Sequence, residues 1–126
     1  MCSAISLGYS DLMEGLRGGN LDGVYLVVAT VMSYTGIIRA VDSDSIIMDI
    51  PLKFYAGDNV MYTPVIIGRD EVLEIKEVPI SGYIKIKTKN DGEFAGEIET
   101  AFSNRMVIDS NGKNIIVYYQ DFVNIE

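Results

Sequence analysis

Apolar and polar residues alternate along most of this 126-residue chain, a pattern typical of short β-strands with one face in a core. The expected strands cover residues 24–32, 35–41, 45–50, 65–67, 72–78, 83–89, 93–101, 106–108, 114–119 and 122–125. Turn-forming sequences such as Asp42-Ser43-Asp44 and Asn111-Gly112-Lys113 separate them. The longer connection 51–64 fits an extended hairpin with arms at 53–55 and 60–62.

Two segments depart from simple alternation. Residues 24–32 are apolar on both alternating faces, so we expect this strand to be covered on both sides. Near the N-terminus, Asp11 and Glu14 have the spacing of a capping box, with Asp11 as N-cap. Leu12 and Met13 then provide an apolar face, which predicts one short helix near residues 11–17.

The strand pattern occurs twice. Residues 34–49 align with 94–109 at an offset of 60, which places Gly36 on Gly96 and Asp49 on Asp109. The last strands align at an offset of 50 because the 51–64 connection adds about ten residues to the first copy. With a boundary at Pro79, we expect residues 1–79 to form the helix and a first barrel, and 80–126 to form a second, SH3-like barrel.

The first copy resembles the Sm and Sm-like (Lsm) family. Its glycine, apolar and aspartate run at Gly36, Ile38, Val41 and Asp42 is similar to the first Sm motif, and residues 65–75 are similar to the second. The resemblance covers about half the chain. It implies a fold of one short N-terminal helix and two tandem five-stranded barrels. It also implies ring assembly through the edges of the fourth and fifth strands.

In the family, an asparagine four residues after the motif aspartate helps hold an RNA base. The RNA-binding candidates in these two motifs and the adjacent turn are Asp42, Asp44 and Arg69. The chain departs from the pattern at Ile46, where the family has an asparagine that holds a base, and at Gly68-Arg69, where the usual order is reversed. The second copy has Phe102 and Tyr119 at the positions of Asp42 and Arg69. The resemblance therefore implies family RNA roles only for Asp42 and Arg69.

Charge opposes nucleic acid over most of the chain. The net charge is −8, and DNA is not expected as a partner because nucleic-acid binding draws on displaced phosphate counterions. The exception is the strand with Lys85, Lys87 and Lys89 on one face, which is the best place for an anionic partner. The alternative is that these lysines are solvated and protect a strand against wrong pairing.

The turn residues also have two interpretations. The oxygens of Asp42, Asp44 and the adjacent serines suit a metal or nucleotide, but the same residues make an ordinary polar turn. Arg69 is suited to phosphate, but it is also expected to pair with neighbouring acids. In each case the structural interpretation is favoured.

Catalysis has little support in the sequence. There is no histidine, which removes the commonest general base, and no zinc-ligand spacing or phosphate-binding glycine loop is present. We expect no catalytic residue, no metal and no cofactor. Cys2 is the only cysteine, and neither a membrane span nor a basic signal start is present, which agrees with a cytoplasmic protein.

These observations predict a non-enzymatic homo-oligomer, either a ring-forming Sm-like scaffold or a protein-interaction module. Its divergence from the family pattern suggests a viral or mobile-element origin. An RNA-binding Sm-like protein is the alternative. The apolar strand 24–32 motivates packing of the two barrels on each other or on further copies, because barrels of about 50 residues are marginally stable alone.

Overall fold

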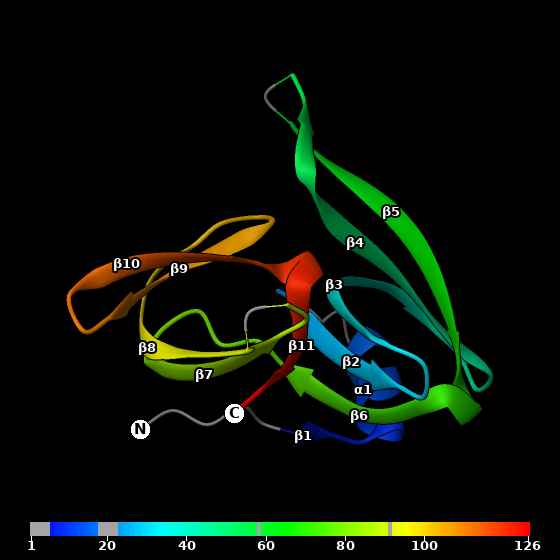
Figure 1. The fold of residues 1–126 in the computed structure, drawn as a ribbon. Coiled ribbons are helices and arrows are strands. Elements are labelled where there is room, and N and C mark those ends of the chain that lie inside the picture. Colours follow the sequence, from blue (N-terminus) through cyan, green and yellow to red (C-terminus); the bar gives the residue numbers. More distant parts are fainter. Residues whose placement is uncertain (1–5, 18–22, 58, 91) are drawn as a thin grey trace.

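The computed structural model describes residues 6–17, 23–57, 59–90 and 92–126, a range that leaves out Cys2. Within them lie one α-helix, two 3-10 turns and eleven strands (Figure 1). The elements are β1 (Ser6–Leu7), α1 (Tyr9–Arg17), β2 (Tyr25–Ala29), β3 (Ser33–Val41), β4 (Ser45–Ala56), β5 (Asn59–Gly68), η1 (Arg69–Glu71), β6 (Val72–Glu77), β7 (Tyr83–Thr88), β8 (Gly92–Ala101), β9 (Arg105–Ser110), β10 (Lys113–Tyr118), η2 (Tyr119–Asp121) and β11 (Phe122–Ile125).

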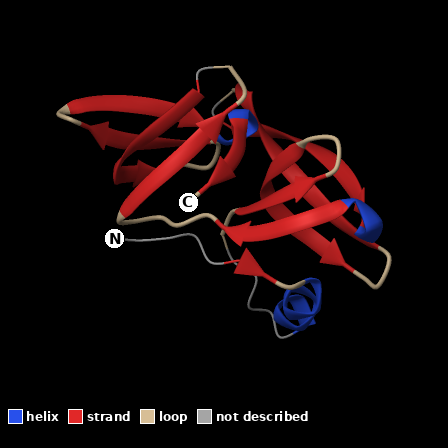
Figure 2. Cartoon of the chain, turned by 60° about the horizontal axis from the view of Figure 1, so that its bottom comes forward, coloured by secondary structure: helices blue, strands red, loops and turns tan. Residues whose placement is uncertain are grey.

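The strands form two antiparallel sheets. The first has the order β1-β6-β2-β3-β4-β5, and the second has the order β10-β9-β8-β7-β11. We call β1 to β6 with α1 and η1 the first unit, and β7 to β11 with η2 the second unit. Figure 2 shows α1 on the side of the first unit. The prediction of an all-β chain with one short helix is confirmed, and Pro79 lies between β6 and β7.

The repeat seen in the sequence is also a repeat of strand register. Ile37 pairs with Asp49 in the first unit, and Glu97 pairs with Asp109 in the second. The pairing slips by one residue after Ile38 in one unit and after Ile98 in the other. Such bulges bend a strand and increase its twist. Both units therefore bend the same two strands at the same place.

Strand β2 supplies side chains to both cores, because its residues point alternately to opposite faces. Val27 lies in the core cluster of the first unit. Leu26 lies in the cluster of the second unit, with Val24 and Val28 packed against it. The expectation of cover on both sides is confirmed for Tyr25–Ala29, where the second unit provides the cover on one side. It is wrong for the end of the predicted strand, because Val31 and Met32 lie beyond β2 and are exposed.

The strand pairings explain why only one copy has this two-sided strand. Tyr25 pairs with Gly36, and Ile84 pairs with Gly96, so β2 and β7 are equivalent at an offset of 59. Leu26 and Val28 therefore correspond to Lys85 and Lys87, which are exposed. The apolar face of β2 is an interface between units, and the same face of β7 carries lysines that contact water.

Each core also contains a fully buried leucine from outside its own five-strand repeat. The first core holds Leu12 of α1, and the second core holds Leu26 of β2. No helix lies between β6 and β7. The outer face of the first unit thus covers the second core, as α1 covers the first.

Polar contacts join the two units beside this apolar interface. Ser33 Oγ donates to the carbonyl of Val123 at 2.6 Å, and Lys76 Nζ donates to the carbonyl of Ile125 at 2.7 Å. Lys53 Nζ lies 2.7 Å from the Asp121 carboxylate. The first two bonds occupy backbone acceptors of β11, and all three contacts hold the units against each other.

The structure corrects two predictions. The helix begins at Tyr9, so Asp11 is not the N-cap. Its carboxylate instead accepts a bond from the N–H of Gly8 at 3.3 Å, the reciprocal part of a capping box. Residues 65–67 are not a separate strand, because β4 and β5 pair from Ser45 and Gly68 out to Ala56 and Asn59. The extended hairpin expected at 51–64 is the outer end of this pair.

Among the described residues no helix is both long and apolar enough to cross a membrane.

Candidate interaction surfaces

The turn between β3 and β4 is held by its own aspartate. Oδ1 of Asp42 accepts the N–H groups of Asp44 at 2.8 Å and Ser45 at 2.9 Å. These two bonds stabilise the carboxylate and lower the pKa of Asp42 below its usual value. The turn is thus the polar turn favoured by the sequence, and no three metal-ligating side chains gather within the described part of the chain.

Arg69 lies beside this turn. Its N–H donates to the carbonyl of Asp44 at 2.8 Å, and its Nη1 donates to the carbonyl of Ser43 at 3.3 Å. The guanidinium lies 4.5 Å from the centre of the Tyr9 ring. The structure therefore brings Asp42, Asp44 and Arg69 together at one turn.

Tyr9 belongs to the same cluster. Its hydroxyl donates to the carbonyl of Asp42 at 2.8 Å. Burial, followed by the nearby charge of Asp42, raises the pKa of Tyr9. The sequence analysis missed this residue because it placed the helix start two residues later, and no local pattern links position 9 to position 42.

The cluster is poorly suited to a phosphate. Arg69 pairs with no carboxylate among the described residues, contrary to the expectation of an acid partner. Its backbone N–H and its Nη1 already donate to carbonyl oxygens of the turn. Asp42 and Asp44 belong to the turn that Arg69 contacts, Asp70 and Glu71 follow it in the chain, and all four are exposed. A polyanion would meet several like charges here for one cation.

The equivalent turn of the second unit is closed. Asn104, at the position of Asp44, is buried and donates from Nδ2 to the carbonyl of Leu52 at 3.0 Å. Tyr119, at the position of Arg69, is 2% exposed and packs edge-on against Phe122. The second copy therefore uses this surface to bind the first unit, and the site is not open to an external ligand.

The expected lysine stripe is divided in the structure. Lys85 and Lys87 line a shallow cavity of about 250 Å³ together with Glu93 and Glu126. Lys85 Nζ lies 3.6 Å from the carboxylate of Glu93 and 3.9 Å from that of Glu126. Lys89 lies beyond the end of β7, where its N–H donates to the carbonyl of Asp121. The carboxylates beside Lys85 oppose an anionic partner.

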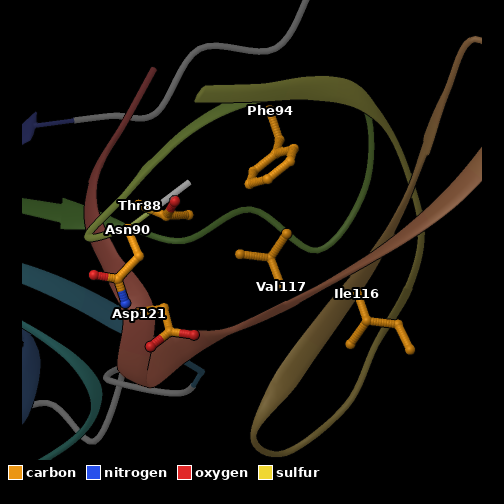
Figure 3. A pocket seen from close by; sticks show the side chains of 6 residues that line it. All are labelled: Thr88, Asn90, Phe94, Ile116, Val117 and Asp121. Carbon is orange, nitrogen blue, oxygen red and sulfur yellow. The ribbon is translucent and has the colours of Figure 1, made fainter. Parts of the chain in front are cut away.

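A second hollow lies at one end of the second unit (Figure 3). It measures about 60 Å³ and is lined by Thr88, Asn90, Phe94, Ile116, Val117 and Asp121. This volume holds a water molecule or two, whereas binding pockets for organic ligands measure several hundred Å³. We assign it no ligand.

Several exposed apolar side chains lie on the β4–β5 hairpin. We call residues 51–63 the arm; its base contacts the second unit at Leu52 and Lys53, and its outer part projects away from the other strands (Figure 1). Phe54 is 68% exposed and Ile66, just below the arm, is 71% exposed, while Met61 and Tyr62 are also exposed. Strand β5 forms the end of its sheet and contains no charged residue. Uncharged sheet edges of this length are templates for pairing with another strand.

Comparison with known proteins gives no family to which these surfaces belong. No protein-family model, no curated protein and no solved structure matches the chain.

Proposed function

We propose that this chain is a non-enzymatic, Sm-like scaffold that associates with further copies of itself through the exposed edge of β5. Each unit contains a run of five strands, β2 to β6 and β7 to β11, in which the fifth returns beside the first: β6 beside β2, and β11 beside β7. This order supports two tandem small barrels of the Sm-like type. The bulges shared by the two units supply the bend that a closed barrel needs.

The observation that carries the proposal is the β5 edge itself. It is unpaired on its outer side and uncharged, and it exposes Tyr62 and Ile66. Most sheet proteins protect such edges with charges or by covering them. Here Pro64 is the only residue of the strand that opposes pairing, because it lacks an N–H.

A family-type ring through the fourth and fifth strands is less well supported. The outer side of β6 is paired with β1 at Leu7 and Ser6. The carbonyls of Val123 and Ile125 in β11 accept bonds from Ser33 and Lys76. Both fifth strands are engaged within the chain, so association through β5 alone is the scaffold that the geometry favours.

Light scattering on the purified full chain tests this proposal. At tens of micromolar, the unmodified protein is expected to exceed the mass of one chain, and Ile66→Lys is expected to reduce it to one chain. Ile116→Lys is the matched control, because Ile116 occupies the same position on β10 and is 55% exposed. A wild-type protein of one-chain mass at this concentration would refute the scaffold.

RNA binding is the second candidate function, because the Tyr9 ring and the Arg69 guanidinium meet at the turn that carries Asp42. Proteins that bind single-stranded nucleic acid combine aromatic side chains, which stack on bases, with positive charges near the phosphates. Filter binding with uridine-rich and adenine-rich oligonucleotides at two salt concentrations tests this function. Salt-sensitive binding that is lost in Arg69→Glu, or in Lys85→Glu with Lys87→Glu and Lys89→Glu, would favour RNA over the scaffold.

A further inference from the structure

The direction of the backbone groups on β5 follows from the register of the β4–β5 pair. Antiparallel partners alternate between pairs that exchange two hydrogen bonds and pairs that exchange none. Pro51 has no N–H and lies opposite Tyr62, so this pair belongs to the second kind. Every second pair is of this kind, so the backbone groups of four residues of β5 point away from β4, toward the free edge. These residues are Tyr62, Pro64, Ile66 and Gly68.

Those outward groups define how two copies of the strand can pair. In one antiparallel register Pro64 lies opposite Pro64 of the other copy, and about four bonds form because both prolines lack a donor. In the register shifted by two residues, Pro64 faces Ile66 and Tyr62 faces Gly68, and about six bonds form. The second register has its two-fold axis at Val65.

Charge favours a second copy over an unrelated acidic or basic strand. Strand β5 has no charge of its own, although the chain carries −8, so it offers nothing for a charged partner to neutralise. In the antiparallel register with its axis at Val65, the two Asp70 residues, which follow the ends of the β5 strands, lie about 30 Å apart along the strand direction. That separation exceeds the Debye length of about 8 Å, so these acidic turns do not repel each other strongly.

We infer that two copies of this chain pair their β5 edges in antiparallel fashion about a two-fold axis at Val65, which joins the two six-stranded sheets into one. This inference rests on the proposed function, and it specifies both the partner and the geometry. The two Tyr62 side chains and the two Ile66 side chains lie on one face of the joined sheet, because residues two apart share a face. Each copy thereby covers the exposed Ile66 with Pro64 of the other.

A cysteine at the axis tests the geometry. In a chain with Cys2→Ser, Val65→Cys places two thiols across a two-fold axis, at a Cα separation of about 4.5 Å that suits a disulfide. Mild oxidation is expected to convert this variant to a covalent dimer. Thr63→Cys, which faces residue 67 of the other copy, and Ile115→Cys, at the position of Val65 in the second unit, are expected to remain uncrosslinked.

Hydrogen exchange gives a second measurement without any cysteine. The N–H groups of Ile66 and Gly68 are expected to exchange more slowly as protein concentration rises, while the N–H of Ile116 is unchanged. An associated protein in which Ile66 and Gly68 are protected but position 65 forms no disulfide would overturn the two-fold pairing and leave association through the β5 edge intact. A protein of one-chain mass at all concentrations would overturn both.

Discussion

Gly36 and Gly96 are the residues that the two copies need most for their shape. In each unit a Cβ at this glycine would collide with the backbone carbonyl of the paired strand, Asp49 in the first and Asp109 in the second. Only glycine allows the strands to approach this closely at the bend. The identical spacing of glycine and aspartate in the two copies thus reflects one steric requirement met twice.

We predict that Gly96→Ala destabilises the protein by more than about 2 kcal/mol, because the backbone of β8 or β9 must shift to admit the methyl group. Gly68→Ala is the matched control. Its φ is −65°, and an added Cβ would meet only the flexible Glu71 side chain at 3.9 Å or more. Urea unfolding of both variants measures the difference, and equal stabilities would show that the close approach has no energetic weight.

Thr35 is a residue whose chemistry does not fit its surroundings. Its Oγ1 is the one buried side-chain polar atom without a hydrogen-bond partner in the described part of the chain. Because an unsatisfied buried hydroxyl costs free energy, Thr35→Val is expected to raise the free energy of unfolding by about 1 kcal/mol. In Thr88→Val the loss of the bond from Thr88 Oγ1 to the Gly92 carbonyl, 3.2 Å, is expected to lower it. Thermal unfolding of the two variants tests whether the free energy of unfolding rises in Thr35→Val and falls in Thr88→Val.

At the scale of elements, β2 distinguishes this chain from two independent barrels. Leu26 is fully buried in the core of the second unit, although it belongs to a strand of the first. Val78, just after β6, lies in the same cluster. The second unit therefore completes its core with side chains from residues that precede Pro79.

We predict that Leu26→Ala costs about 2 to 5 kcal/mol and that the protein still unfolds in a single transition. Lys85→Ala, at the equivalent exposed position of β7, is expected to change stability by less than about 0.5 kcal/mol. Calorimetry checks both points. Two separate transitions, with only one of them affected by Leu26→Ala, would contradict the shared core.

Strands were predicted well wherever apolar and polar residues alternated. The burial of β2 on both faces was predicted because its residues are apolar on both alternating faces. The sequence placed the fold repeat correctly because Gly36 and Gly96 mark the same bend. It missed β1 and the start of α1, since these short elements depend on contacts with β6 and Asp42 and not on a local pattern. It also divided the β4–β5 hairpin at Pro64, which an edge strand tolerates.

The candidate surfaces were harder to predict, because their meaning depends on neighbours far away in sequence. Asp42 and Arg69 were expected together on the basis of the family resemblance, and the structure adds Tyr9 to them. Lys85 looked free in the sequence, but Glu126 and Glu93 lie beside it in space. The resemblance implied association through the edge of the fourth expected strand, 65–67, which lies in β5, but the exposure of Ile66 follows only from the sheet order.

At the scale of the whole molecule, the contact between the two units cannot be repeated to add a further chain. The surface of the first unit that covers the second core is apolar at Leu26 and Val28, and the corresponding surface of the second unit carries Lys85 and Lys87. Burial of these lysines in the same way against another chain would cost several kcal/mol per charge. At the other end, α1 covers the first core through Leu12.

With both ends of the pair closed, the long sheet edges that remain are β5 and β10. The β5 edge is the one proposed for association, because it carries no charged residue whereas β10 carries Lys113. An interface made by one strand edge about a two-fold axis is satisfied by two copies and cannot grow. The account therefore specifies a dimer. A ring or a filament would need a second, different contact on each chain.

Sedimentation equilibrium of the full chain over a wide concentration range tests this claim most directly. We expect a reversible equilibrium between one chain and two that saturates at two, with the Ile66→Lys variant remaining at one chain throughout. A protein that stays at one chain at every concentration, or that grows beyond two chains as concentration rises, would contradict the account.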